Sequence, residues 1–282
     1  MRRLLIPVIA LALAPPLAAQ VFRSRVESVR VDALVTEDGQ PVRGLTAGDF
    51  QLRDEGVLQQ VQLIEAGTFP VNVVLALDMS ASLDTPRLTR LRRGGDGLVA
   101  ALRDDDRGAV LGFNHVVGLE QPPTSDRALL RRALSGLVPS GMTSLVDAMY
   151  SGLLLADSGE HRSLLIVFSD GLDTSSWLGA AAVVRTARRL ETVVYAVASM
   201  RSEVPVLLDQ VASATGGKVL RVDSEKLDEA FVAILREFRE RYLLAYSLPA
   251  GAAPGWHRIE LRVKRRAATV RARPGYFVAE AH

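Results

Sequence analysis

The chain has 282 residues, of which 48% are hydrophobic and 23% are charged, and these values are typical of a globular protein with a sizeable core in one or two domains. Its formal net charge of +2 excludes a strong overall attraction to nucleic acid or to an anionic membrane. It contains no cysteine, so disulfides are excluded as well.

The first twenty residues have the pattern of a secretory signal peptide. The basic start MRR precedes the short apolar run LLIPVIALALA, and PPLAAQ then ends in small residues. We expect residues 1–20 to be removed by cleavage after Ala19 or Gln20, leaving a secreted or periplasmic protein of the bacterial envelope. An uncleaved membrane anchor is the alternative, although the apolar run is short for a membrane span and Pro15 and Pro16 break it.

Residues 21–69 show the alternation of apolar and polar residues that is typical of antiparallel strands. The segment VESVRVDALV places Val29, Val31, Ala33 and Val35 on one face. The turn signals EDGQPVRGL and RDEG follow. This region therefore predicts a series of short antiparallel strands.

Residues 70–241 change to apolar runs that alternate with helical patterns. The strand-like runs are VNVVLALD, RGAVLGFN, SLLIVFSD, TVVYAVAS and GKVLRV, and a final helix is expected over about residues 225–240. Continuously apolar strands separated by helices predict an α/β domain with a doubly wound, mostly parallel sheet that is covered on both faces. HVVGLEQPP is compatible with an antiparallel edge strand, and Gly94, Gly95 and Gly97 are expected to let the first helix pack closely on the sheet.

Residues 242–282 return to a strand pattern. YLLAYSL predicts one strand, and WHRIELRVK with ATVRARPGYFV has the pattern of a hairpin around RRA. Neither this segment nor residues 21–69 has enough strands for a sandwich of its own. We therefore expect the two flanks to pair into one small β-sandwich, with the α/β domain of residues 70–241 inserted between them.

Three polar clusters fall where the α/β region is expected to bind ligands. DMSAS brings Asp78, Ser80 and Ser82 to the end of the first strand, SGMTS brings Thr143 to a helix N-terminus, and FSDG places Asp170 after LLIVF. In a doubly wound sheet, ligands bind at the carboxyl ends of the strands. These five side chains are therefore expected to converge.

Each cluster also has a purely structural explanation. Ser80 and Ser82 could cap the helix that begins near Pro86, Thr143 could be an N-cap, and Asp170 could belong to an ordinary turn.

Other chemistry fits the sequence less well. A phosphatase of the haloacid dehalogenase type needs a second carboxylate where Ser80 stands, and a serine hydrolase needs Gly-x-Ser-x-Gly with a histidine base. Four histidines lie outside the clusters and are expected at the surface: His115, His161, His257 and His282. The acidic run of residues 104–106 is expected to be a solvated helix end.

With these motifs in order, residues 71–240 resemble a von Willebrand factor A domain. The metal-ion-dependent adhesion site (MIDAS) of that family has an Asp-x-Ser-x-Ser motif, a threonine in a glycine-containing loop and an aspartate in a Ser-Asp-Gly-like turn. The matching residues here are Asp78, Ser80, Ser82, Thr143 and Asp170. The segments DGQPVRGLTAGDFQLRDEG and RARPGYF are similar to flanking patterns of secreted bacterial proteins that carry this domain.

The resemblance implies a divalent cation, Mg²⁺ above all, with Mn²⁺ or Ca²⁺ as alternatives. The serine hydroxyls would bind it directly, Thr143 directly or through water, and Asp78 and Asp170 through water as orienting groups. Neutral ligands leave much of the ion's charge uncompensated, so that an acidic side chain of a partner protein can complete the coordination.

The implied function is metal-dependent protein binding, in adhesion or envelope assembly, by an exported protein that is not an enzyme. A metal-dependent phosphate-ester hydrolase and a structural envelope or secretion scaffold are the alternatives. The family resemblance also allows the last helix of the domain to slide when the site gains a ligand, although a fixed packing helix is favoured.

Overall fold

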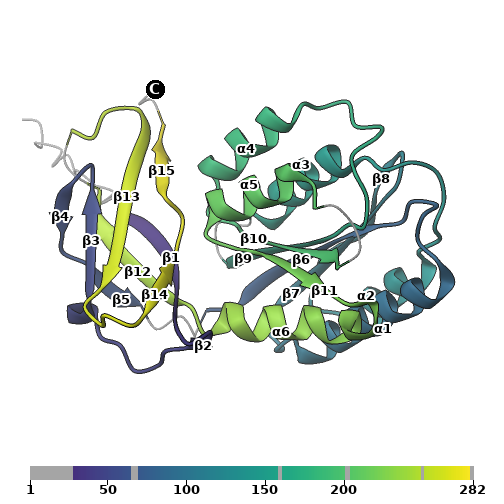
Figure 1. The fold of residues 1–282 in the computed structure, drawn as a ribbon, viewed down its shortest axis with the longest axis horizontal. Helices are drawn as coiled ribbons and strands as arrows, with labels where there is room; N and C mark the ends of the chain where they lie inside the picture. Colours follow the sequence, from purple (N-terminus) through teal and green to yellow (C-terminus); the bar gives the residue numbers. More distant parts are fainter. Residues whose placement is uncertain (1–27, 65–68, 158–160, 201–203, 249–250, 280–282) are drawn as a thin grey trace, which may run out of the picture.

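The computed structural model describes residues 28–64, 69–157, 161–200, 204–248 and 251–279. The predicted signal peptide of residues 1–20 lies outside these ranges. A helix-covered central sheet stands beside two smaller sheets (Figure 1). Among the helices of the described ranges, none is both long and apolar enough to cross a membrane.

The central sheet has six strands in the order β11-β10-β9-β6-β7-β8. Five of them are parallel to one another: β6 (Val71–Asp78), β7 (Arg107–Phe113), β9 (Arg162–Phe168), β10 (Val193–Ser199) and β11 (Val219–Val222). The edge strand β8 (Val117–Thr124) runs antiparallel to β7. The predicted α/β class and the antiparallel edge strand are therefore confirmed.

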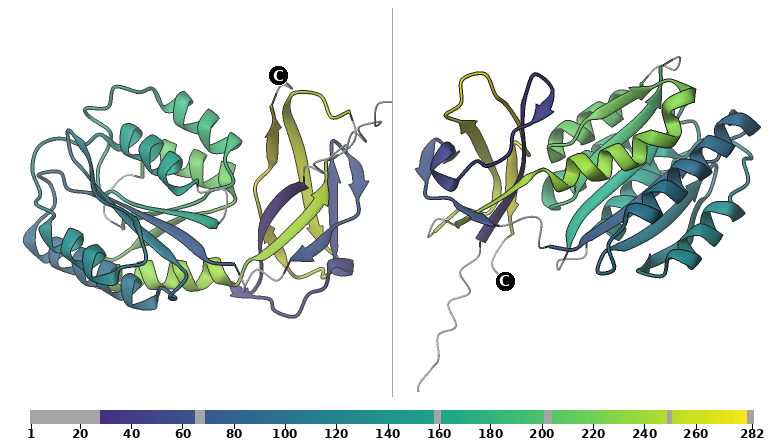
Figure 2. Two further views of the ribbon diagram at one scale, coloured as in Figure 1. Left: turned by 180° about the vertical axis from the view of Figure 1, so that it is seen from behind. Right: turned by 90° about the horizontal axis from the view of Figure 1, so that it is seen from below.

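Helices cover both faces of this sheet. One face carries α1 (Thr85–Ala101), α2 (Arg127–Gly136) and α6 (Leu227–Arg239), which lie in front in the right-hand view of Figure 2. The other face carries α3 (Leu145–Ala156), α4 (Ala180–Arg189) and α5 (Val206–Thr215). Along β6, Val73, Leu75 and Leu77 join the first core while Val74 and Ala76 join the second. Every residue of β6 is therefore buried, as its continuous apolar sequence predicts.

The three glycines of α1 serve contacts between helices. A Cβ on Gly94 would lie 3.1 Å from Phe231 of α6, and a Cβ on Gly95 would lie 2.8 Å from Leu134 of α2. Gly97 likewise faces α6. The expectation that these glycines serve packing on the sheet was wrong, because α1 uses them to approach its two neighbouring helices.

The flanking segments pair with each other although they are far apart in the sequence. Strand β1 (Ser28–Glu37) is antiparallel to β12 (Tyr242–Ser247), and β3 (Phe50–Asp54) is antiparallel to β13 (Gly255–Val263). The shorter strands of these sheets are β2 (Gln40–Pro41), β4 (Val57–Gln59), β5 (Gln62–Ile64), β14 (Thr269–Arg271) and β15 (Gly275–Val278).

Both of these sheets contribute to one hydrophobic core. The predicted inward face of β1 is confirmed, because Val29, Val31, Ala33 and Val35 are all buried. They share a core cluster with Leu52 of β3 and with other residues of the four-stranded sheet.

The hairpin expected around RRA is not formed as predicted. Strand β14 pairs with β1 in one sheet, and only β15 returns to pair with β13 in the other. The chain changes sheets between them, at Ala272 to Pro274. Pro274 has no backbone N–H to donate, and its carbonyl accepts the N–H of Ile259 at 2.8 Å.

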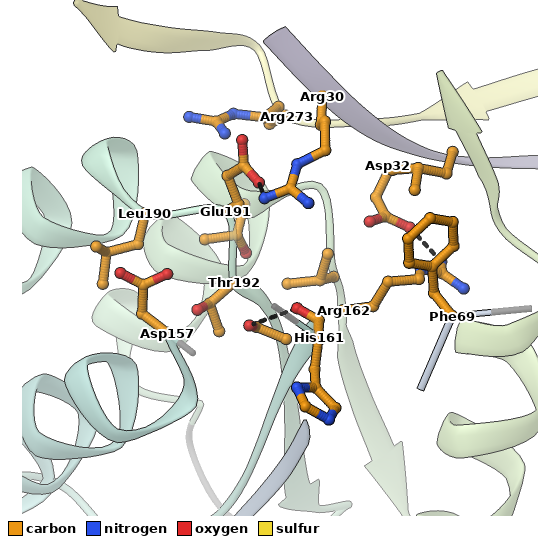
Figure 3. Close-up of a pocket in the computed structure, with 14 residues that line it drawn as sticks. Arg30, Asp32, Phe69, Asp157, His161, Arg162, Leu190, Glu191, Thr192 and Arg273 are labelled. Carbon is orange, nitrogen blue, oxygen red and sulfur yellow. Dashed lines mark hydrogen bonds and ion pairs between the residues drawn. The ribbon is translucent and has the colours of Figure 1, made fainter. Parts of the chain in front are cut away.

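The flanking strands contact the amino-terminal edge of the central sheet through buried arginines. Arg162 at the start of β9 forms an ion pair with Asp32 of β1 (Figure 3). Its guanidinium also lies 4.4 Å from the ring centroid of Phe238. Arg241, between α6 and β12, donates to the carbonyls of Asp32 and Gly216, both at 2.9 Å. These arginines bind backbone carbonyls and a carboxylate that belong to the flanking strands and to the α/β region.

Tyr195 and Asp106 extend these polar contacts into the α/β region. Burial raises the pKa of Tyr195 to about 12, so its hydroxyl stays protonated and donates to Glu237 at 2.8 Å. Asp106 accepts the N–H of Val71 at 2.8 Å and pairs with Arg239. The expectation of a solvated acidic run holds for Asp104 and is wrong for Asp106, which is buried.

Arg162→Ala is expected to lower the free energy of unfolding by about 3 kcal/mol, because the change leaves Asp32 in a largely buried position without its main partner. The matched control is Arg30→Ala, which removes the exposed pair with Glu191 and is expected to cost about 0.5 kcal/mol. Urea denaturation followed by circular dichroism measures both. Equal losses in the two variants would contradict the structural role assigned to Arg162.

Candidate functional site

Asp78 is the last residue of β6, the strand that lies between β7 and β9. Its Oδ1 accepts the N–H of Ser80 at 2.9 Å, and its Oδ2 accepts the hydroxyl of Ser169 at 2.7 Å. Burial raises the pKa of Asp78, the hydrogen bonds from Ser169 and Ser80 oppose this shift, and the nearby charge of Asp170 adds to it. The carboxylate is therefore held in one orientation in a place where a positive charge would stabilise it.

Ser80, Ser82 and Asp170 form a chain of contacts beside Asp78. The hydroxyl oxygens of Ser80 and Ser82 lie 2.9 Å apart, and the Ser82 hydroxyl donates to Oδ1 of Asp170 at 3.2 Å. Three side chains that the sequence places at two different strand ends are thus brought together.

Thr143 reaches the same edge from the loop before α3. Its Oγ1 lies 3.9 Å from the position that a Cβ on Gly171 would occupy, next to Asp170. Backbone hydrogen bonds tie this loop to the loop after β6, from Ala81 N–H to Gly141 carbonyl at 3.0 Å and from Ser140 N–H to Met79 carbonyl at 2.7 Å. Asp78 at the end of β6 and the loops that carry the other four predicted site residues therefore lie at the carboxyl edge of the sheet.

The helix-capping explanations for these residues were wrong. The N-cap of α1 is Asp84, whose side chain accepts the N–H of Arg87 at 2.8 Å. The N-cap of α3 is Ser144, whose side chain makes no capping hydrogen bond. Ser80, Ser82 and Thr143 are thus not needed to begin a helix.

Arg87 is a site residue that the sequence analysis missed. Its guanidinium forms an ion pair with Asp170, whose side chain is only 3% exposed, and its Nε lies 3.3 Å from Asp84. The available signal was its position in the first turn of the helix that follows DMSAS. Arg87 compensates the charge of one of the two carboxylates at the site.

The loop that follows Asp170 is fixed by hydrogen bonds to the start of α3. The two carboxylate oxygens of Asp147 accept the N–H groups of Trp177 and Leu178, both at 2.9 Å. The Thr143 carbonyl accepts the N–H groups of Thr174 and Ser175 at 2.9 and 3.1 Å. A hydrogen-bonded loop therefore presents Trp177, whose side chain is 95% exposed.

Further exposed apolar side chains occur on the loops of this edge. Met142, which is 56% exposed, directly precedes Thr143, and Leu172, which is 53% exposed, lies two residues after Asp170. Other large apolar residues exposed on these loops are Val116, Val138 and Leu178. Exposed apolar side chains gathered on one edge of a domain are a feature of protein-binding surfaces.

The donor set fits a hard divalent cation. The five residues offer only hydroxyl and carboxylate oxygens, which Mg²⁺, Mn²⁺ and Ca²⁺ prefer. Asp78 already uses both of its oxygens in hydrogen bonds, whereas the adjacent hydroxyls of Ser80 and Ser82 can reorient their protons and turn lone pairs toward an ion.

Similarity to known proteins agrees with this geometry. Residues 73–173 match the family model of the von Willebrand factor type A domain. An uncharacterized protein, sll0103, of Synechocystis sp. is 28% identical over 101 residues, which are 35% of this chain and 24% of that relative.

Solved structures share the fold at low identity. A von Willebrand factor type A protein from Catenulispora acidiphila is 14% identical, with a TM-score of 0.57 over 88% of this chain and 73% of its own. Proximal thread matrix protein 1 from the mussel byssus, solved with a zinc-occupied MIDAS motif, is 15% identical, with a TM-score of 0.57 over 67% of this chain and 50% of its own. The type V pili tip protein Mfa5 from Porphyromonas gingivalis is 13% identical, with a TM-score of 0.50 over 60% of this chain and 95% of its own domain.

Proposed function

Because residues 73–173 match the family model of the von Willebrand factor type A domain, we propose that this chain is a protein-binding module whose site takes a divalent cation, Mg²⁺ above all. The observation that carries the proposal is the contact of the Ser80 and Ser82 hydroxyls, 2.9 Å apart, beside the carboxylate of Asp170. Domains of this family are generally interaction modules without catalytic activity. We therefore propose a binding role for this chain instead of an enzymatic one.

Ser80 and Ser82 are proposed as the direct ligands of the cation, with Thr143 binding directly or through water. Asp78 and Asp170 are proposed to orient these groups and to hold water, and the internal hydrogen bonds of Asp78 support that role. When bound, the cation would supply a positive charge that its neutral ligands do not cancel. A carboxylate is the ligand class that such an ion recruits from a partner.

The proposed partner is a protein that offers an acidic side chain among apolar residues. The acidic group would meet the cation, and the apolar residues would contact Trp177, Met142 and Leu172. Trp177 is the strongest candidate for a dominant contact, because tryptophan buries a large area and its loop is already ordered by Asp147.

The domain architecture and the location of this module are proposed from the sequence and from the pairing of the flanking strands. Residues 21–69 and 242–282 would form a small β-sandwich that carries the inserted domain of residues 70–241, which is supported by the core that the two flanking sheets share. Residues 1–20 would direct export, so that the partner is met in the periplasm or outside the cell.

Ser82→Ala is expected to weaken Mn²⁺ and Mg²⁺ binding at least tenfold, because it removes one proposed direct ligand. Since Ser82 is exposed, the free energy of unfolding should change by less than about 0.5 kcal/mol. The control is Ser135→Ala, which changes an exposed serine on α2 and should leave the affinity for both cations unchanged. Isothermal titration of the full chain measures this, and equal affinities in the two variants would refute the ligand role.

Arg87→Met is expected to tighten Mn²⁺ binding roughly fivefold, because removal of a nearby positive charge favours the cation by about 1 kcal/mol. Arg90→Met is the matched control on the same helix, since the Arg90 guanidinium donates to the Glu225 carbonyl instead of to the site. Weaker binding by Arg87→Met would show that Arg87 supports the site by holding Asp170.

Trp177→Ala is expected to reduce capture of a partner at least tenfold while Mn²⁺ affinity stays unchanged. The test compares envelope proteins retained by the immobilised full chain in Mg²⁺ and in EDTA. Trp256→Ala, in the flanking sheet, is the control. Proteins captured equally with and without the ion, or equally by both tryptophan variants, would argue against the proposed interface.

A further inference from the structure

A second cluster of metal-ligating side chains lies in the four-stranded flanking sheet, on different elements from the MIDAS-like site. It consists of Asp54 at the end of β3, Glu55 in the turn that follows, and His257 in β13. One ligand atom from each residue lies within 4.8 Å of the others. The pairing of β3 with β13 brings Asp54 opposite Ile259, which sets His257 close by. We call this cluster the Asp54 site.

Asp54 is a buried carboxylate whose two oxygens differ in their hydrogen bonding. Oδ2 accepts hydrogen bonds from the hydroxyls of Tyr246 at 3.0 Å and Tyr276 at 2.7 Å. Burial and the neighbouring Asp54 raise the pKa of both tyrosines, so they remain donors. Oδ1 is buried without a hydrogen-bond partner in the described part of the chain, and the residue is 3% exposed. An orphaned carboxylate oxygen is costly, so this atom points to a missing positive group.

His257 presents a ring nitrogen to that oxygen. Its Nε2 lies 2.7 Å from the carbonyl oxygen of Ala253, and because a carbonyl only accepts, Nε2 carries a hydrogen. Its Nδ1 lies 3.7 Å from Oδ1 of Asp54, which is too long for a hydrogen bond. The ring also stacks on Tyr276, with centroids 5.1 Å apart. The sequence predicts a surface position for His257, and its side chain is 14% exposed, so most of the ring is covered.

Glu55 completes the cluster from a constrained turn. Its N–H donates to the Arg258 carbonyl at 3.0 Å, and its Oε1 accepts the Arg258 N–H at 2.5 Å. The backbone φ of Glu55 is +48°, and a glycine follows it. The turn therefore holds a second carboxylate against the strand that carries His257.

We propose that Asp54, Glu55 and His257 bind a divalent cation of the Zn²⁺ class. One imidazole nitrogen with two carboxylates is a ligand set that Zn²⁺ accepts, and the nitrogen disfavours Mg²⁺ and Ca²⁺. The Oδ1 to Nδ1 separation of 3.7 Å is slightly wider than the roughly 3.4 Å expected between two ligands of a tetrahedral Zn²⁺. A small movement of the imidazole toward Asp54 would therefore let Oδ1 and Nδ1 bind the same Zn²⁺ ion.

The surroundings of the ligands support the proposal. Metal-binding histidines usually donate their second ring N–H to a carbonyl or carboxylate, as His257 does to Ala253, and ligating carboxylates are themselves hydrogen-bonded, as Asp54 is by two tyrosines. In a chain without cysteine, the cation would cross-link the β3–β4 turn to β13 in the way that a disulfide does elsewhere.

The test measures Zn²⁺ binding to the full chain in a background that lacks the serine ligands of the other site, Ser80→Ala with Ser82→Ala. Competition with a chromophoric chelator is expected to find one Zn²⁺ per chain in this background. His257→Gln should weaken binding at least tenfold, and so should Glu55→Gln, which keeps the test valid if Asp54→Asn fails to fold. His115→Gln, an exposed histidine in the α/β region, is the control and should bind as the background does.

Co²⁺ substitution adds a spectroscopic readout. The background should show the visible absorption of a tetrahedral Co²⁺ ion, and His257→Gln should lose it. Absence of Zn²⁺ binding in the background, or binding that His257→Gln leaves unchanged, would overturn the proposal and leave His257 and Asp54 as an ordinary ion pair. Mg²⁺ titration of the wild-type chain reports separately on the MIDAS-like site, so failure of one site is distinguishable from failure of the other.

Discussion

The parallel register of β6 with β7 and β9 is the constraint on which the candidate site depends. Asp78 pairs with Phe113 and Leu77 pairs with Phe168, so the carboxyl ends of the three strands coincide. The loops that follow must then meet at one edge, and backbone hydrogen bonds between them set their relative positions. Strands β6 and β9, in which every residue is buried, therefore end beside the same group of polar residues.

The flanking strands occupy the opposite, amino-terminal edge of the same sheet (Figure 1). Helix α6 spans the distance between the edges and continues directly into β12, with Arg241 buried at the junction. Helix α1 follows its N-cap Asp84 and packs closely against α6 at Gly94, where an added Cβ would lie 3.1 Å from Asp228 and Phe231. Sliding of α6 on ligand binding stays a prediction, and the contact with α1 is compatible with a fixed packing helix as well.

Local sequence patterns were sufficient for the strands of the central sheet, the inward face of β1 and the contacts among Ser80, Ser82 and Asp170. The remaining features depend on contacts between distant segments. Arg87 is one of many arginines, and only the folded chain brings it to Asp170. The relation of His257 to Asp54 follows from the register of two strands about 200 residues apart. Pro274 separates β14 from β15, yet a regular apolar pattern runs through both strands.

Binding of a cation by Ser80 and Ser82 is tested most directly by anomalous diffraction from crystals of the full chain soaked in MnCl₂. We predict an anomalous peak within about 2.5 Å of both serine hydroxyl oxygens, with Asp78 and Asp170 reaching it through water. A map with no peak between the loops that follow β6 and β9, while the protein remains folded, would contradict metal binding at this edge of the sheet.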